Sequence, residues 1–193
     1  MTTQQRPALF LDRDGVINKE INYLHRIKDF IFLPGVFETC RLFQEAGFAV
    51  IVVTNQSGIA RGYYTEEDYG ILTEWMRQQF IHAGVPLTDV LHCPHLPEAQ
   101  VTLYRMACPC RKPNPGMILD ASQRHGIDVS RSIMVGDKLS DIQAGHKAGV
   151  GHLVLVHSSY EITLEDAQRA HYVAEGLGQT TAFAHWFLQG PPP

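Results

Sequence analysis

The segment Phe48–Val53 constrains the fold of this chain more than any other feature, because it is a nearly unbroken run of apolar residues. A strand with one face in water alternates apolar and polar side chains, so an unbroken run indicates a strand buried on both faces. Such strands occur in parallel sheets that helices cover on each side. We therefore expect Phe48–Val53 to lie inside a sheet of this kind.

Further strand-like runs alternate with helical segments along the chain. Additional strands are expected at Ala8–Leu11, Val90–His92, Ile133–Val135 and His152–Val156. Helices are expected over Gly35–Ala46, from Thr65 to about Ala83, from Asn114-Pro115 to Gly126, over Ser140–Ala148 and from Thr163 onward. Thr65 and Asp68 have the spacing of a capping box, as do Thr163 and Asp166. The alternation predicts an α/β fold, Rossmann-like and three-layered (α/β/α), with a central parallel sheet.

Two segments lack both patterns. Residues 18–34 carry no helical spacing and are expected to form a small flap near the end of the first strand. Residues 93–113 form a long irregular loop, which in a compact domain needs a function or a staple. Neither segment is large enough to be a cap domain. We therefore expect one domain over residues 1–193, with a proline tail at Pro191–Pro193.

Charge and composition argue against several classes of partner. The net charge of −4 disfavours nucleic acid as the main partner. No apolar stretch approaches the ~20 residues that cross a membrane, and the polar start does not resemble a signal peptide. A cytoplasmic protein with no membrane partner is expected, and a monomer is the default because no coiled coil or large apolar stripe is present. Disulfides are disfavoured in the cytoplasm, so the four cysteines need another explanation.

Two acids come directly after the first strand. Asp12 and Asp14 stand two positions apart, and Gly15 follows them. The carboxyl ends of strands are where open α/β sheets bind ligands. Carboxylates held this close repel each other, and a divalent metal is the obvious positive partner. A lone Asp-x-Asp is usually a turn or a solvated pair. Whether these two acids form a functional site therefore depends on the residues at the other strand ends.

Those other strand ends are also polar. They contribute hydroxyl, amide, cationic and acidic groups, namely Thr54, Asn55, Gln56, Arg111, Lys112, Asp137, Lys138 and Asp141. Small donors and free backbone N–H groups suit an oxyanion, above all a phosphate. Acids that hold a hard metal and a fixed lysine can together neutralise a phosphoryl group during transfer. The combination therefore indicates phosphoryl chemistry, which none of these elements indicates alone.

The cysteines that cluster lie in the irregular loop. Cys93-x-His95 and Cys108-x-Cys110 supply three thiolates and one imidazole, a set that suits tetrahedral Zn²⁺ in a closed structural site. Unliganded thiols are the alternative. The zinc loop, residues 93–110, would fix the adjacent Arg111 and Lys112. Cys40 lies on an apolar helix face and is expected to pack in the core.

The order of these motifs resembles the haloacid dehalogenase-like (HAD) phosphatases. Residues 12–15, 54–55, 112 and 136–141 correspond to the four motifs of that superfamily. The resemblance implies that Asp12 is the nucleophile, that Asp14 is the general acid and then the base, and that Asp137 binds Mg²⁺ with Asp12 and the Asp14 backbone carbonyl. It implies that Thr54 and Lys112 contact the phosphoryl group. Asp141 would orient Lys112 or support the metal.

A narrower resemblance comes from the zinc loop. DRDGVIN (12–18), TNQSGIARG (54–62), CRKPNPGM (110–117) and VGDKLSD (135–141) resemble the D-glycero-D-manno-heptose-1,7-bisphosphate 7-phosphatases. These phosphomonoesterases release the 7-phosphate through an aspartyl-phosphate, in the synthesis of ADP-heptose, a lipopolysaccharide precursor. Their site has no large cap and suits a substrate with a second phosphate. Arg111, Arg61 and Arg13 are the candidates to bind that phosphate, with Arg111 favoured.

Other functions stay open at this point. Histidinol-phosphate phosphatases share the same motifs and zinc loop, so histidinol phosphate is the nearest alternative substrate. A non-catalytic, zinc-stapled phosphosugar-binding module is an alternative of another class, although a binder needs no nucleophile and acid together. The residues leave open the anomer preference at C1, the oligomeric state and the role of His25 in the flap.

Overall fold

The predicted parallel sheet lies at the centre of the computed structural model, which describes residues 5–179. Its six strands follow the order β3-β2-β1-β4-β5-β6, and every neighbouring pair is parallel. The strands are β1 (Ala8–Leu11), β2 (Ala49–Asn55), β3 (Asp89–Cys93), β4 (Ile133–Gly136), β5 (His152–Val156) and β6 (Tyr172–Ala174). The order reverses at β1, because β2 and β4 pair with its two edges. Such a reversal creates a crevice at the carboxyl ends of the strands.

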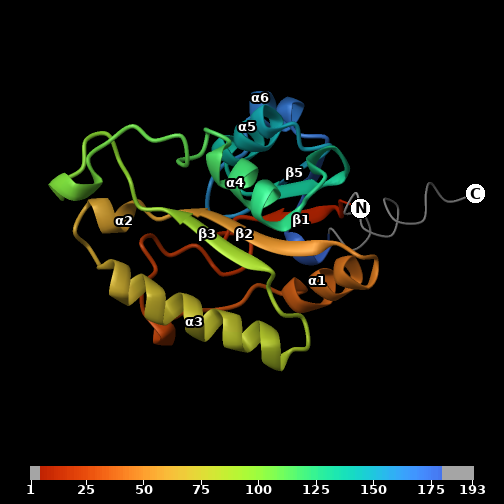
Figure 1. Ribbon diagram of the computed structural model, residues 1–193, viewed down its shortest axis with the longest axis horizontal. Helices are drawn as coiled ribbons and strands as arrows, with labels where there is room; N and C mark the ends of the chain where they lie inside the picture. The colour runs from red at the N-terminus through yellow and green to blue at the C-terminus, as the bar shows by residue number, and fades with distance from the viewer. Residues whose placement is uncertain (1–4, 180–193) are drawn as a thin grey trace, which may run out of the picture.

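Helices connect these strands. The α-helices are α1 (Val36–Glu45), α2 (Ser57–Ala60), α3 (Glu66–His82), α4 (Gly116–His125), α5 (Leu139–Ala148) and α6 (Leu164–Arg169). Short 3-10 helices are η1 (Ile27–Asp29), η2 (Thr102–Tyr104), η3 (Val129–Arg131) and η4 (Leu177–Gln179). Figure 1 shows α1 and α3 on one face of the sheet and α4 and α5 on the other, so the three-layer prediction is confirmed.

The core is divided between the two faces of the sheet. On β1, Leu9 and Leu11 pack with residues of α1, α3 and the flap, whereas Ala8 and Phe10 pack with residues of α4 and α5. Side chains of a strand point alternately to opposite faces, which explains why one short apolar strand serves both clusters. All four residues are completely buried. The apolar run of β2 is divided in the same way, as expected for a strand covered on both sides.

Most of the predicted elements are present with small shifts at their ends. Both capping boxes form: the Thr65 hydroxyl accepts from the Asp68 N–H and the Thr163 hydroxyl from the Asp166 N–H, while each aspartate accepts from the threonine N–H. The sequence did not predict α2 or β6. The proline tail at Pro191–Pro193 lies outside the described residues.

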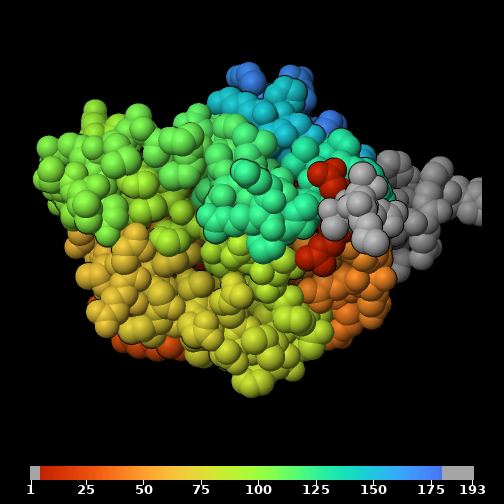
Figure 2. All heavy atoms as spheres, viewed as in Figure 1, coloured from red at the N-terminus to blue at the C-terminus, as the bar shows by residue number. Residues whose placement is uncertain are grey.

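The two irregular segments lie at the carboxyl end of the sheet. Figure 1 and Figure 2 show the 93–113 loop, in green at the left, beside α2 and the start of α3. The Val101 N–H donates to the Ala60 carbonyl of α2 at 3.0 Å, which ties the loop to that helix. Within residues 5–179, none of the helices is long and apolar enough to span a bilayer.

Candidate active site

Lys112 lies at the centre of a buried group of charges at the carboxyl end of β1. Its Nζ atom is 2.9 Å from Asp12 Oδ1, 2.7 Å from Asp141 Oδ1 and 2.7 Å from the Val53 carbonyl. These three acceptors match the three protons of an ammonium group. Burial alone would lower the pKa of Lys112, but Asp12 and Asp141 outweigh burial and raise it. Lys112 is therefore a fixed cation in contact with Asp12.

Asp137 is a buried acid beside this group. Neither of its carboxylate oxygens has a well-formed hydrogen bond within the described chain. Burial and the nearby Asp12 raise the pKa of Asp137 to about 8. Gly15 lies directly against this carboxylate and has φ +86°, so a side chain at that position would collide with Asp137. The backbone after Asp14 thus approaches the acid as only glycine allows.

These acids fit a hard divalent cation. Carboxylate oxygens of Asp12, Asp137 and Asp141 lie within 4.8 Å of one another. Asp141 is already engaged by Lys112 and by the Lys138 N–H, so Asp12 and Asp137 remain as ligands. Buried carboxylate oxygens without a well-formed hydrogen bond, beside a second carboxylate, are donors that suit Mg²⁺. The residues therefore fit Mg²⁺ at this position.

Asp14 is not part of that group, and other residues hold its side chain. Arg13 donates to its Oδ1 from Nε at 3.2 Å and from Nη2 at 2.9 Å, and Nη2 is also 2.9 Å from Oδ2. Asn18 and Gln56 each donate one further bond at 3.0 Å. Burial would raise the pKa of Asp14, but Arg13 and these hydrogen bonds lower it. The side chain of Asp14 is thus a separately held carboxylate beside the metal-fitting acids.

Arg13 requires a correction. The sequence made it a candidate for binding a second phosphate, but its side chain is only 1% exposed and its guanidinium is paired with Asp14. A group buried and engaged in this way cannot meet a phosphate that projects outward. Arg61 and Arg111 are more exposed and remain candidates.

The residues after β2 connect the acids to each other. Gln56 Nε2 donates to Asp14 and to the Thr54 hydroxyl, while the Tyr64 hydroxyl donates to Gln56 Oε1 at 2.6 Å. Asn55 exchanges two bonds with the Lys112 backbone, at 3.0 and 3.1 Å. The sequence predicted Thr54, Asn55 and Gln56 as phosphate-binding groups, and the structure places them beside Asp14 and Lys112.

An open, polar cavity adjoins these groups. Its lining residues come from the flap and from the segments that follow β1, β2, β4 and β5. They are Asp14, Glu20, Asn22, Tyr23, Asn55, Gln56, Ser57, Gly58, Tyr64, Lys138 and Tyr160. Lys138 Nζ is 3.2 Å from Glu20 Oε2 and 4.2 Å from the centre of the Tyr160 ring. The predicted flap therefore supplies one wall of the cavity, and Lys138 contacts that wall through Glu20.

His25 and Tyr63 lie next to the cavity without lining it. The His25 ring stacks on Tyr64 with 5.1 Å between ring centres, and its Nδ1 is 2.9 Å from the Tyr23 carbonyl. Tyr63 is exposed and contacts the edge of the Tyr23 ring. The sequence had no signal that separated Tyr63 from Tyr64, nor one that identified Glu20 or Tyr160 as pocket residues.

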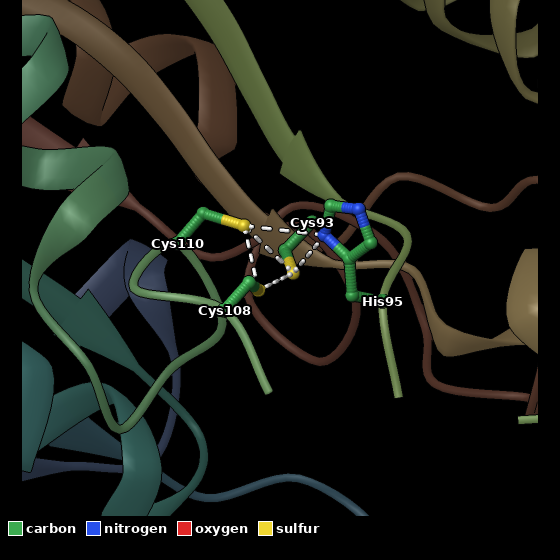
Figure 3. Close-up of side chains that lie close together, drawn as sticks. All are labelled: Cys93, His95, Cys108 and Cys110. Atoms are coloured by element: carbon green, nitrogen blue, oxygen red, sulfur yellow. Dashed lines mark hydrogen bonds between the residues drawn. The ribbon is translucent and has the colours of Figure 1, made fainter. Parts of the chain in front are cut away.

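Cys93, His95, Cys108 and Cys110 converge from the two ends of the loop (Figure 3). The three Sγ atoms are 2.9–3.3 Å apart, and His95 Nδ1 is 3.7 Å from Cys93 Sγ and 3.5 Å from Cys110 Sγ. Ligands at ~2.3 Å around a tetrahedral Zn²⁺ lie slightly farther apart than these sulfurs do. The donors are those of a structural zinc site, and Cys40 lies apart from them in the core, as predicted.

The Cys/His cluster is linked to the cations that follow it. Arg111 Nη1 donates to the His95 carbonyl at 3.2 Å, and Asn114 Nδ2 donates to the Cys108 carbonyl at 3.0 Å. Lys112 comes next along the chain and is held by Asn55. A metal in the cluster would thus fix the backbone that positions both Arg111 and Lys112.

Comparisons with known proteins agree with this geometry. A HAD-hydrolase-like family model matches residues 109–180. The chain is 46% identical to a D-glycero-beta-D-manno-heptose-1,7-bisphosphate 7-phosphatase from Yersinia pestis over 91% of its length and 93% of the relative's. It is 48% identical to a D-glycero-alpha-D-manno-heptose-1,7-bisphosphate 7-phosphatase from Photorhabdus laumondii, over 78% and 82% of the two chains.

A solved structure shares the fold at a TM-score of 0.77. It is the D,D-heptose 1,7-bisphosphate phosphatase from B. bronchiseptica in complex with magnesium and phosphate. The sequences are 29% identical, and the match covers 96% of this chain and 99% of that one. Relatives that act on the alpha and the beta anomer are about equally similar to this chain, so overall identity does not distinguish the two specificities.

Proposed function

The chain belongs to the D-glycero-D-manno-heptose-1,7-bisphosphate 7-phosphatase family of the HAD superfamily, and from this premise we propose how its residues hydrolyse the 7-phosphate of that sugar bisphosphate. The reaction is phosphomonoester hydrolysis, and its product is heptose 1-phosphate, a precursor of ADP-heptose. The support for the mechanism is the geometry at the carboxyl end of β1.

In the first step, an Asp12 carboxylate oxygen forms a bond to phosphorus, and the bond between phosphorus and the sugar O7 breaks. Because the pKa of Asp14 is lowered in the free site, Asp14 first takes up a proton as the phosphate binds, and it then gives that proton to the departing O7. In the second step, Asp14 takes a proton from a water molecule, and the oxygen of that water attacks the phosphorus of the aspartyl-phosphate. The bond between Asp12 and phosphorus then breaks, so inorganic phosphate is released and Asp12 is restored. Thr54, Asn55 and Gln56 hold phosphoryl oxygens, and Lys138, which lines the same cavity, adds a positive charge.

Asp12, Asp137 and the Asp14 backbone carbonyl would hold Mg²⁺, and Lys112 would supply the remaining positive charge. The metal, when bound, neutralises negative charge on the phosphoryl oxygens. Lys112 does the same from a fixed position, because Asp141 and the Val53 carbonyl hold its ammonium group in place. Preorganised charge of this kind stabilises a transition state without reorganisation.

Cys93, His95, Cys108 and Cys110 would hold a structural Zn²⁺ that fixes the loop carrying Arg111. With four protein ligands, the zinc has no open position for chemistry. Arg111 would bind the second phosphate of the substrate, since its planar fork matches phosphate oxygens. Arg61 is the second candidate for that contact, because the Tyr23 ring at the cavity wall lies 5.9 Å from its guanidinium carbon.

The observation that carries the mechanism is the contact of Asp12 with Lys112 beside Asp137, whose carboxylate has no well-formed hydrogen bond in the described chain. Its test is phosphate release by an Asp12→Asn variant. An amide cannot form the aspartyl-phosphate, so turnover should fall by about 10³-fold or more. Asp120→Asn, on the outer surface of α4, is the matched control and should retain activity. Turnover by Asp12→Asn at the wild-type rate would remove Asp12 as the nucleophile.

The substrate is tested with the same preparation. We expect kcat/KM for heptose 1,7-bisphosphate to exceed kcat/KM for histidinol phosphate, and the two heptose anomers measured side by side give the C1 preference. A higher value for histidinol phosphate would replace the substrate while leaving the mechanism in place. Phosphosugar binding without Mg²⁺-dependent turnover would identify a binding module instead.

A further inference from the structure

Arg13 is a charged residue buried as deeply as the hydrophobic core. Among the side chains of the described residues that are less than 2% exposed, that of Arg13 is the largest. In the sequence, Arg13 stands between the two acids Asp12 and Asp14. Burying a guanidinium is energetically unfavourable unless it is paired and hydrogen-bonded. The mechanism above gives this residue no role, and its pairing partner is the carboxylate that handles the leaving-group proton.

The contacts of Arg13 come from three parts of the fold. Its Nε and Nη2 atoms hold Asp14, and Nη2 also donates to the Leu24 carbonyl of the flap at 3.0 Å. Its guanidinium carbon lies 5.9 Å from the centre of the Tyr69 ring on α3, at the outer limit of a cation–π contact. One side chain therefore fixes Asp14 relative to both the flap and α3.

The geometry of the Arg13–Asp14 pair suits a role in orienting the Asp14 carboxylate better than a role in stabilising the fold. Asn18 donates one bond to Oδ1 of Asp14, and Gln56 donates one bond to Oδ2. Arg13 contacts both oxygens, and its planar fork fixes the plane of the carboxylate. Its Nη1 has no partner within residues 5–179, so the buried charge is incompletely satisfied. A buried ion pair of this kind is weak support for stability.

Resting on the proposed role of Asp14 as the acid, we propose that Arg13 is a positioning residue that holds the Asp14 carboxyl group in one orientation at the polar cavity and links it to the flap. Arg13 does not contact the reacting atoms. Its effect should therefore depend on how much the leaving group needs a proton.

The experiment compares two leaving groups in wild-type, Arg13→Met, Arg13→Lys and Asp14→Asn enzymes. A sugar phosphate leaves as an alkoxide and needs the proton, whereas p-nitrophenyl phosphate leaves as a stable phenolate and does not. The measured quantity is kcat/KM, which reports on the steps up to release of the leaving group, so later hydrolysis of the aspartyl-phosphate does not enter it. General acid catalysis contributes about 10²–10⁴-fold.

We expect Arg13→Met to lower kcat/KM for the sugar phosphate by about 10²-fold, with less than a fivefold loss for p-nitrophenyl phosphate. Arg13→Lys keeps the charge without the fork and should give a smaller loss with the same selectivity. Arg26→Met, an exposed arginine of the flap, is the matched control and should change neither substrate. Equal losses on both substrates would mean that Arg13 is merely structural and would overturn the proposal.

Asp14→Asn separates this inference from the mechanism on which it rests. Asp14→Asn could lower kcat/KM for the sugar phosphate selectively while Arg13→Met leaves the ratio of kcat/KM for the two substrates unchanged. That result would overturn the role of Arg13 and leave the role of Asp14 in place. Equal loss on both substrates in Asp14→Asn removes Asp14 as the acid, whatever Arg13 does. If Arg13→Met does not fold, Arg13→Lys decides: a selective loss of about tenfold supports positioning, and a wild-type ratio overturns it.

Discussion

Three carboxylates and one ammonium group share the buried centre of the site, and their charges do not balance. When all three acids are ionised, Asp12, Asp137 and Asp141 carry three negative charges, whereas Lys112 carries one positive charge. The difference equals the charge of one divalent cation. Burial and then the nearby charge of Asp12 raise the pKa of Asp137 to about 8. The protein thus keeps a destabilising carboxylate at the position where a metal would neutralise it.

In Mg²⁺-free buffer, Asp137→Asn should stabilise the protein. Because the folded pKa of about 8 lies above the unfolded value, ionised Asp137 destabilises the fold. This destabilisation is absent below about pH 4, grows as pH rises and is complete above about pH 8. At pH 8 the variant should gain about 1–3 kcal/mol in the free energy of unfolding, and adding Mg²⁺ should stabilise only the wild type. Urea melts with and without Mg²⁺ at pH 5 and pH 8 measure both effects; a less stable variant at pH 8 would contradict the charge argument.

Elements whose signals are local could be predicted from the sequence. The capping boxes at Thr65 and Thr163 and the apolar run of β2 determine their own structure, because the interacting residues are close in the chain. α2 has only four residues, and β6 has three and an exposed Tyr172, so neither is long enough to show a periodicity. Their structure depends on packing against segments that are remote in sequence.

The same distinction holds for the site. Residues that follow strands could be found, because parallel strands bring their carboxyl ends together. The contact of Glu20 with Lys138 joins residues 118 positions apart, and the burial of Arg13 depends on the Leu24 carbonyl. A charged residue in a loop is usually solvated, so sequence alone favoured an outward role for Arg13.

The zinc loop, residues 93–110, joins the Cys/His cluster to α2 and leads into Arg111. Its ends converge at the Cys/His cluster, and its middle bonds to α2 through Val101. Arg111 follows its last residue and bonds back to the His95 carbonyl. If a metal holds this loop, loss of one ligand should affect binding of the second phosphate more than chemistry at the first. Asn55 would still hold the Lys112 backbone from β2.

Cys108→Ser tests this coupling. We expect bound zinc to fall well below one equivalent and KM for the bisphosphate to rise by about 10–100-fold, the value of one charge-assisted bond to phosphate, with a smaller change in kcat. Cys40→Ala is the matched control, since Cys40 is a buried cysteine outside the cluster, and it should retain zinc. Metal analysis and initial rates provide the two measurements. Full zinc content in Cys108→Ser, or an unchanged KM after zinc loss, would refute the coupling.

At the scale of the whole molecule, one sheet separates two core clusters, and the question is whether they unfold as one. The charged site favours unfolding as one unit, because it brings together Asp12 after β1, Asp137 after β4 and Lys112 before α4. Separating these elements would break the contacts within the site. Each strand of the sheet centre also places side chains in both clusters, as Leu9 and Phe10 do on β1. Loss of either cluster would therefore leave a central strand uncovered on one face.

Phe10→Ala measures this cooperativity across the sheet. Phe10 packs in the cluster of α4 and α5, whereas Trp75 packs against the opposite cluster. The chain has two tryptophans, so a Trp186→Phe background leaves Trp75 as the reporter. Truncating a buried phenylalanine should destabilise by about 3–5 kcal/mol. If the sheet joins both clusters into one cooperative unit, the unfolding midpoints measured by Trp75 fluorescence and by far-UV circular dichroism should shift together to lower urea concentration.

The control is Leu164→Ala, where the side chain is 76% exposed, and it should shift neither midpoint. An unmoved Trp75 transition beside a shifted dichroism transition would mean that the two faces unfold separately, and the single-domain prediction would then be wrong.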